Sequence, residues 1–346
     1  MQRTIKILFL LLLVWSCDDE PVETIFSDLD TRKGVFISCE GNFMYGNGSL
    51  SFYNSDRKIV TNQIFHASNN APLGDVVQSL EIFNNTLFIV VNNSGKIYTV
   101  NPETIEFENI ITGLTSPRYI HFISTSKAYV SDLYANHIIV INPATLEVRG
   151  KIDLGEHTSE QMVQVGNRIF VSSWSYDEYL LVIDTETDEL VTKIKVPFQP
   201  KDLEIDKDGK IWVLSDGGNA WNNAGRGHPA LSRIDPLTFT IEQIYRFDED
   251  SYPSGLNINS SGDSIYYING DVFKMGTDSR DLPGSSFIKA ENRNLYGIAV
   301  NPDNNEIYIT DAIDYSQNAI IYRYSRSGEL IDTFRAGINP SDFLFR

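Results

Sequence analysis

Residues 116 to 155 read SPRYIHFISTSKAYVSDLYANHIIVINPATLEVRGKIDLG, and this segment decides the fold. It holds four short runs rich in Val, Ile and Tyr, which are RYIHFI, KAYVSD, HIIVIN and VRGKIDL. Along the chain, runs of this kind are separated by Asn, Asp, Gly and Ser. Short β-branched and aromatic runs between turn residues are typical of β-strands. The segment therefore predicts one unit of four antiparallel strands.

The turn INPATLEV between the third and fourth runs recurs along the chain. It returns as VNPETIEF at 100–107, IDTETDEL at 183–190 and IDPLTFTI at 234–241. An Asp or Asn side chain at the second position can cap the turn, and Thr can close it with local hydrogen bonds. The recurrence indicates an internal structural repeat.

The first strand of each unit gives the period of the repeat. Its apolar anchor residues are separated by 40, 42, 41, 53, 42 and 45 residues, and they are Leu80, Ile120, Met162, Leu203, Leu256, Ile298 and Phe343. Four strands every 40 to 45 residues are typical of β-propeller blades. We therefore predict an all-β fold, a seven-bladed β-propeller with four-stranded blades.

The two ends of the chain complete one blade between them. The segment NPSDFLFR at 339–346 supplies a first strand with no strands after it. The segments VFISCEGN, SLSFYN and IVTNQIF near the amino terminus supply three strands with no first strand before them. The closing blade is therefore predicted to contain strands from both termini, which holds the ring shut.

The amino-terminal segment MQRTIKILFLLLLVWSCDDE has the pattern of a signal peptide. Arg3 and Lys6 precede an apolar stretch that is too short to span a membrane. The run Val14-Trp15-Ser16-Cys17 resembles a bacterial lipobox, and the alternative is an ordinary signal peptide with an incidental cysteine. We expect a signal peptide at 1–16, lipidation of Cys17, an acidic tether at 17–32 and the propeller at 33–346.

Charge and cysteine content exclude several classes of function. The formal charge is −18, and removal of Arg3 and Lys6 with the signal peptide makes it −20. Such a surface repels nucleic acid and anionic lipid, so membrane contact is expected only through the lipid anchor. If Cys17 carries lipid, Cys39 has no partner for an intramolecular disulfide, and its apolar surroundings favour a core position.

One face of the ring is expected to carry the function. In a propeller, the loops before the first strands and the loops between second and third strands meet at the same end. One of these loops, SDGGNAWNNAGRGHPA at 215–230, lies inside the single long interval and has a composition suited to a shaped loop. Aromatic and amide residues gather in this set, and exposed aromatic patches usually mark contact sites. The candidate ligand-binding residues are Phe43, Tyr45, Asn92, Asn93, Arg118, Asp132, Tyr134, Trp174, Tyr176, Asp216, Trp221, Arg226, His228, Tyr252, Tyr296, Asp311 and Tyr315.

With its lipobox, its acidic CDDE segment and repeat texture such as KAYVSDLYANHIIVIN, the chain resembles the BtuG-type surface lipoproteins of Bacteroidetes. It shares this texture with the wider YncE-like propellers. The resemblance covers roughly residues 17 to 346. It implies lipid anchoring on the extracellular face of the outer membrane, capture of cobalamin (vitamin B12), and transfer of it to a TonB-dependent transporter. It transfers no ligand motif, so the candidate residues rest on loop position alone.

Two other classes of function stay open at this stage. A surface glycan-binding or adhesion propeller would use a similar aromatic and amide-rich face. A lactonase-type hydrolase would hold a cation at the channel mouth, for which Glu40, Asp202, Asn257 and Asp342 are conceivable ligands. The sequence shows no Ser/His/Asp arrangement and no metal-binding histidine spacing. We therefore expect no catalytic residues, no bound metal and no cofactor apart from cobalamin as ligand.

Overall fold

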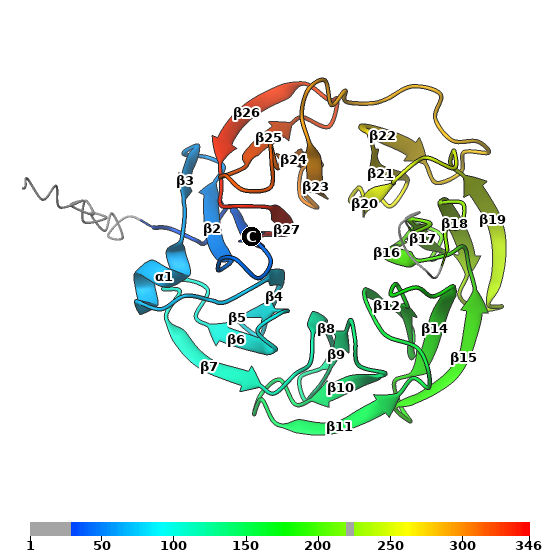
Figure 1. Cartoon of the computed structure of the whole chain (residues 1–346), viewed down its shortest axis with the longest axis horizontal. Coiled ribbons are helices and arrows are strands. Elements are labelled where there is room, and N and C mark those ends of the chain that lie inside the picture. Colours follow the sequence, from blue (N-terminus) through cyan, green and yellow to red (C-terminus); the bar gives the residue numbers. More distant parts are fainter. Residues whose placement is uncertain (1–28, 219–224) are drawn as a thin grey trace, which may run out of the picture.

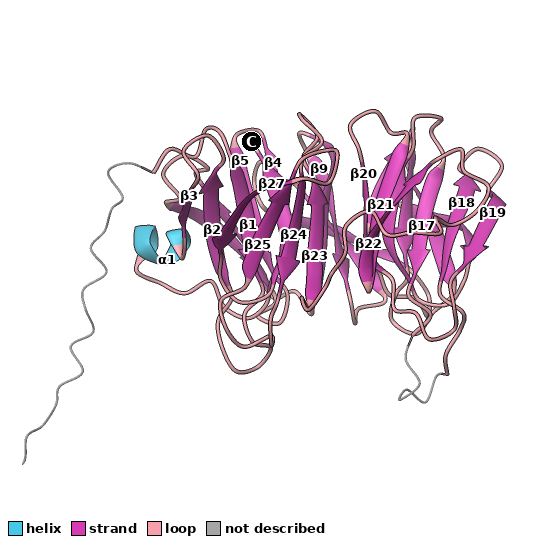
Figure 2. Cartoon of the chain, turned by 90° about the horizontal axis from the view of Figure 1, so that it is seen from above, coloured by secondary structure: helices cyan, strands magenta, loops and turns pink. Residues whose placement is uncertain are grey.

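Seven β-sheets surround a central channel in the computed structural model of this chain, which describes residues 29–218 and 225–346 (Figure 1). The sheets stand side by side as blades of a short cylinder (Figure 2). The predicted all-β fold and the seven-bladed β-propeller are both confirmed. Cys17 and Trp221 lie outside the described residues, as do the predicted signal peptide and lipobox.

The first blade is closed by both ends of the chain. Its inner strand is β27 (Pro340–Phe345), which pairs antiparallel with β1 (Val35–Cys39). Outside β1 lie β2 (Ser49–Asn54) and β3 (Ile59–Thr61). The predicted closure is confirmed, and Figure 1 shows the last strand beside the first.

The other six blades follow one another along the chain, each from the channel outward. Their inner strands are β4 (Val77–Phe83), β8 (Pro117–Ser124), β12 (Met162–Val165), β16 (Pro200–Ile205), β20 (Ser254–Ile258) and β23 (Leu295–Val300). Their second strands are β5 (Thr86–Val91), β9 (Lys127–Asp132), β13 (Arg168–Ser172), β17 (Ile211–Ser215), β21 (Ser264–Asn269) and β24 (Ile307–Asp311). Their third strands are β6 (Lys96–Val100), β10 (His137–Ile141), β14 (Tyr179–Asp184), β18 (Ala230–Asp235), β22 (Asp271–Gly276) and β25 (Ile320–Tyr324). The outer strands are β7 (Phe107–Thr112), β11 (Val148–Asp153), β15 (Glu189–Lys195), β19 (Thr240–Arg246) and β26 (Leu330–Arg335).

The sixth blade differs from the other six at its outer edge. Its sheet has three strands in the order β20-β21-β22, whereas every other sheet has four. At the fourth position Ile288 forms a single antiparallel bridge with Val272 of β22. Pro283 and Gly284 precede this bridge, and both residue types are poor strand formers, so the edge is a loop with one point of pairing.

The repeated turn has the structure that its sequence predicts. In INPATLEV, the side chain of Asn142 accepts a hydrogen bond from the backbone N–H of Ala144, and Thr145 bonds Glu147. Leu146 has a φ of 60°. The other three copies place Ile105, Asp188 and Phe239 in the same left-handed conformation. The Asx cap fixes the turn tightly enough to hold residues that disfavour positive φ.

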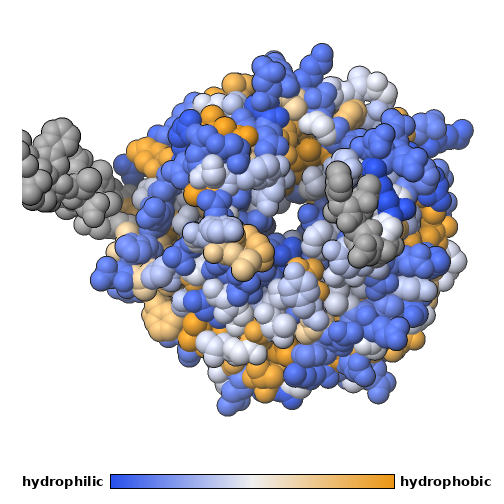
Figure 3. Space-filling view, viewed as in Figure 1, coloured by the Kyte–Doolittle hydropathy of each residue, from blue (hydrophilic) through white to orange (hydrophobic). Residues whose placement is uncertain are grey.

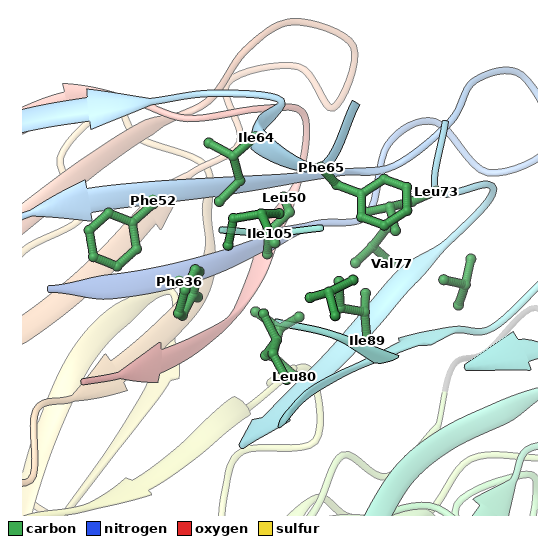
Figure 4. Close-up of a cluster of buried hydrophobic side chains, with 13 residues drawn as sticks. Phe36, Leu50, Phe52, Ile64, Phe65, Leu73, Val77, Leu80, Ile89 and Ile105 are labelled. Atoms are coloured by element: carbon green, nitrogen blue, oxygen red, sulfur yellow. The ribbon is translucent and has the colours of Figure 1, made fainter. Parts of the chain in front are cut away.

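The hydrophobic core is divided among the seven contacts between adjacent blades. Each of the seven buried clusters draws residues from two neighbouring blades. Figure 4 shows the cluster between the first two blades, where Phe36 and Leu50 approach Val77 and Leu80 (Figure 4). Because each blade buries both of its faces, the ring is rigid and can hold loops in fixed positions.

Part of the segment before β1 packs on the propeller. Thr31 is buried, and its hydroxyl donates to the carbonyl of Pro102 at 2.6 Å. Leu29 packs against the first core cluster. Leu29 and Thr31 therefore contact the propeller, although they lie within the range that we assigned to the tether.

Two further features concern Cys39 and the helix. Cys39 is fully buried and unpaired, as we predicted, and burial raises its pKa to about 11. The helix α1 (Ile64–Asn69) leads from β3 to β4 and buries Ile64 and Phe65. In residues 29–218 and 225–346, no helix has the length and apolar character that a membrane span requires.

Candidate ligand-binding site

A cavity of about 850 Å³ opens at one end of the central channel. Its wall contains inner-strand residues as far as Val300 and Phe345, together with residues from the loops before the inner strands and from the loops between second and third strands. We call the end of the ring that carries these loops the loop face. Eight predicted residues line the cavity, and they are Phe43, Asn92, Arg118, Tyr134, Trp174, Tyr252, Tyr296 and Tyr315. Figure 3 shows an opening at the centre of the ring (Figure 3). The two sets of loops therefore converge on one hollow, as the repeat pattern predicts.

A second, smaller pocket of about 420 Å³ adjoins the first on the loop face. We call it the side pocket. Tyr134, Trp174 and Tyr252 line both hollows, while Tyr176 and Asp216 line the side pocket alone. The two hollows thus share an aromatic boundary.

The exposed aromatic side chains of the described chain gather on the loop face. Seven Phe and Tyr residues are largely exposed, and six of them come from these loops: Phe43, Tyr45, Tyr134, Tyr176, Tyr252 and Tyr315. Tyr176 and Tyr315 have φ values of 61° and 63°. Left-handed backbone costs free energy for a bulky residue, so the surrounding loop must hold each of these two residues in place. The protein therefore holds strained backbone and exposed rings at the same end.

An ion pair lies in the wall of the central cavity. Arg118 donates from Nε to Glu160 at 2.8 Å and from Nη2 at 2.6 Å, and from Nη1 to Gln78 at 2.5 Å. Glu160 is fully buried, and the Arg118 side chain is 12% exposed. Burial opposes the charge of Arg118, but Glu160 outweighs this effect and raises the arginine pKa above its usual value. The guanidinium is therefore fixed in place and charged.

Trp174 is held from several sides. Its indole Nε1 donates to Asp216 at 2.7 Å, and Gln199 donates to its backbone carbonyl. The ammonium of Lys201 lies 5.5 Å from the centre of its ring. Burial acts to lower the pKa of Lys201, but nearby carboxylates, first that of Asp202, raise it above its usual value. One face of the Trp174 ring is thus covered by a cation.

The charges around the central cavity nearly balance. Three acidic and three basic residues line it, and they are Glu40, Asp202, Asp342, Arg118, Lys201 and Arg293. The hydroxyl of Tyr296 donates to Glu40 at 2.7 Å, so this carboxylate is also engaged. The cavity therefore lacks the strong negative charge of the whole chain.

Three predicted residues on the loop face form hydrogen bonds that hold its loops in place. Asp132 accepts hydrogen bonds from the backbone of Ser116, Tyr134 and Ala135, and Asp311 accepts them from Asn294 and Ile313. These two carboxylates shape the loops that carry the exposed tyrosines. Asn92 lines the cavity and donates to Ser116 and Pro117 of the next blade.

Other predicted residues lie on the loop face outside both hollows. Tyr45 is 93% exposed, and Asn93 donates to Asp75. Arg226 stacks on Tyr252 at 4.9 Å and pairs with Asp250. His228 is exposed and lines neither hollow. The structure therefore does not bring these four side chains into either wall.

Sequence reasoning missed a set of hydrogen bonds between the inner strands. The carboxylate of Asp342 accepts from the backbone N–H of Leu80 on the next inner strand, and Asp202 accepts from Leu256 in the same way. Gln161 bonds Leu203 by the same pattern. All three directly precede an anchor residue. The regular spacing of the anchors could therefore have identified these positions from the sequence.

Three carboxyl groups of the inner strands are difficult to ionise. Burial raises the pKa of Asp342 to about 6, of Glu81 to about 7 and of Glu204 to about 8. The described residues contain no group of three His, Cys, Asp or Glu side chains arranged to hold a metal ion.

One protein family matches this chain over nearly its whole length. The model of a domain of unknown function, DUF5074, matches residues 33–345, nearly the whole chain. The chain belongs to the DUF5074 family. No curated protein matches it.

Several solved structures are similar to this DUF5074 chain. A quinoprotein alcohol dehydrogenase-like protein from Bacteroides thetaiotaomicron shares 18% identity over 92% of this chain and 79% of that chain, with a TM-score of 0.72. Hydrazine synthase from Kuenenia stuttgartiensis shares 15% identity over 76% and 88%, with a TM-score of 0.59. A streptogramin B lyase shares 12% identity over 77% and 85%, with a TM-score of 0.58. At these identities the similarity shows the propeller fold alone.

Proposed function

We propose that this DUF5074 protein binds cobalamin or a related corrinoid on the loop face, at the cell surface, and passes it to a TonB-dependent transporter. The observation that carries the proposal is the central cavity, with its aromatic rim and nearly balanced charges. Its volume of about 850 Å³ is at the upper end of the usual range for small-molecule sites.

The chemistry of the wall suits a large ligand with many amide groups. The cavity contains amide, hydroxyl, carboxylate and cationic groups from several blades, so it offers donors and acceptors around its whole rim. Each neutral hydrogen bond adds only about 0.5–1.5 kcal/mol, so tight binding needs many of them on a surface that is already ordered. A corrinoid has several amide side chains around a broad ring, and a rigid propeller meets it with little loss of entropy.

The hydrogen bonds of the inner-strand carboxylates favour a binding function over a lactonase-type hydrolase. A lactonase-type site would use carboxylates such as Asp202 and Asp342 to hold a cation. In this protein both accept backbone hydrogen bonds from the neighbouring blade, at 2.8 Å for each. These groups join the blades and are engaged in that role.

The proposed location rests on the sequence. The lipobox at Cys17 and the acidic residues after it support an anchor on the outer face of the outer membrane. The TonB-dependent transporter of the same membrane is then the natural recipient, because a surface protein alone cannot move its ligand inward.

Calorimetry of the purified protein with cyanocobalamin tests the proposal. We expect saturable binding with a dissociation constant in the micromolar range or tighter, and a thermal stabilisation that grows with ligand concentration. A panel of neutral oligosaccharides is the matched comparison. Heat from an oligosaccharide with none from cyanocobalamin would overturn the proposal in favour of glycan binding.

A further inference from the structure

The side pocket is a separate hollow with its own lining. It holds about 420 Å³ beside the central cavity of about 850 Å³, and the two meet at Tyr134, Trp174 and Tyr252. A ligand with a compact body would fill the central cavity only. Two hollows with a shared boundary suit a ligand that has a large body and a smaller group on an arm.

The walls of the side pocket are fixed before any ligand arrives. Asp216 accepts from the indole of Trp174 with one oxygen and from the backbone of Gly218 with the other. A Cβ atom at Gly218 would lie 2.4 Å from Oε1 of Gln199, so these two lining residues of the side pocket are closely packed. Such preorganisation lowers the entropy cost of binding.

The aromatic rings of the side pocket favour a neutral planar group. Lys201 lies against the ring of Trp174 at 5.5 Å, and Arg226 lies against the ring of Tyr252 at 4.9 Å. A cation on one face of a ring is attracted to its π electrons, so the opposite face attracts a second cation less well. Asp216 accepts from two neutral donors, and its negative charge acts on the nearby Lys201, so it is already offset by a cation. An electron-rich heteroaromatic ring can still stack there.

Tyr176 is an aromatic residue of this pocket. It is 58% exposed, has a φ of 61°, and lines the side pocket without lining the central cavity. Truncation of Tyr176 therefore changes the side pocket and leaves the lining of the central cavity unchanged.

Building on the proposed corrinoid function, we infer that the side pocket binds a neutral, planar heteroaromatic group carried on an arm of the ligand, while the macrocycle lies in the central cavity. In a corrinoid this group is the base of the nucleotide arm. Trp174 contacts both parts of the ligand, and Tyr176 contacts the base.

Two ligands and two substitutions test the inference by calorimetry. Cyanocobalamin carries the nucleotide arm, and dicyanocobinamide has the same macrocycle without it. Tyr176→Ala should weaken cyanocobalamin binding about tenfold, equivalent to about 1.4 kcal/mol, and change dicyanocobinamide binding less than about twofold. Trp174→Ala should weaken both ligands. Tyr176→Phe should bind like the parent protein, because stacking requires the ring and not the hydroxyl.

Tyr45→Ala is the control, since Tyr45 is exposed on the same face and lines neither hollow. If Tyr176→Ala weakens both ligands equally, or neither, the inference is wrong while the corrinoid function stands. If the parent protein binds neither ligand, the corrinoid function fails, and the inference fails with it.

Discussion

Replacement of Arg118 by alanine tests how far the loop face depends on a buried charge pair. Arg118 makes three contacts of 2.6–3.0 Å with Glu160 and one with Gln78. Glu160 is fully buried, so Arg118→Ala leaves a carboxylate in the protein interior without its cation. Loss of one partner from a buried pair typically costs about 3–5 kcal/mol.

Urea unfolding measures this cost. The Glu160 side chain stays buried after the substitution and has lost the guanidinium that balanced its charge. We therefore expect the free energy of unfolding to fall by about 3–5 kcal/mol at pH 8.

The double variant Arg118→Met/Glu160→Leu is the matched control. It removes both charges and keeps similar volumes, so it should lie within about 2 kcal/mol of the parent protein at the same pH. A loss below about 1 kcal/mol for Arg118→Ala at pH 8, or a double variant as unstable as the single one, would refute this reasoning.

Three further predictions concern stability and reactivity. Because burial raises the pKa of Glu204 to about 8, the native state binds more protons than the unfolded state between about pH 4.5 and 8, so stability should fall as pH rises through that range. Glu204→Gln should flatten this dependence in urea titrations at several pH values, and an unchanged slope would contradict it. Cys39 should resist a thiol reagent at pH 8 in the folded protein and react fully in denaturant, because burial raises its pKa to about 11. Rapid reaction of the folded protein would show that Cys39 is accessible to solvent. Deletion of residues 340–346, which removes the inner strand of the first blade, should abolish cooperative thermal unfolding in calorimetry, whereas Leu330→Ala at an exposed outer-strand position should change it little.

The fold was accessible from the sequence because its signals are local and repeated. The hydrogen bonds of the turn around Asn142 lie within one blade. Buried anchors such as Ile120 and Leu203 occur once in each blade, so their spacing gives the repeat directly. Blade number and ring closure follow from counting these repeats. The irregular sixth blade was not predicted, because the anchor spacing does not report how many strands each blade completes. Pro283 and Gly284 before the bridge at Ile288 were the signal against a regular fourth strand.

The site was accessible only in part. Loop position correctly placed Trp174 and Tyr252 at the cavity, because topology alone brings their loops together. It could not separate residues that face the cavity from those that shape a loop, such as Asp132, since both kinds are polar and occupy the same loops. That distinction depends on side-chain direction, which repeat spacing does not encode.

The closing blade also determines when this protein can become complete. Ser38 and Asp342 are hydrogen-bonded across 304 positions of the chain. During synthesis, the inner edge of β1 has no partner until β27 has been made. Contacts of such long sequence separation form slowly. Until β27 pairs with β1, the blades form an open array, and this one pairing completes the ring.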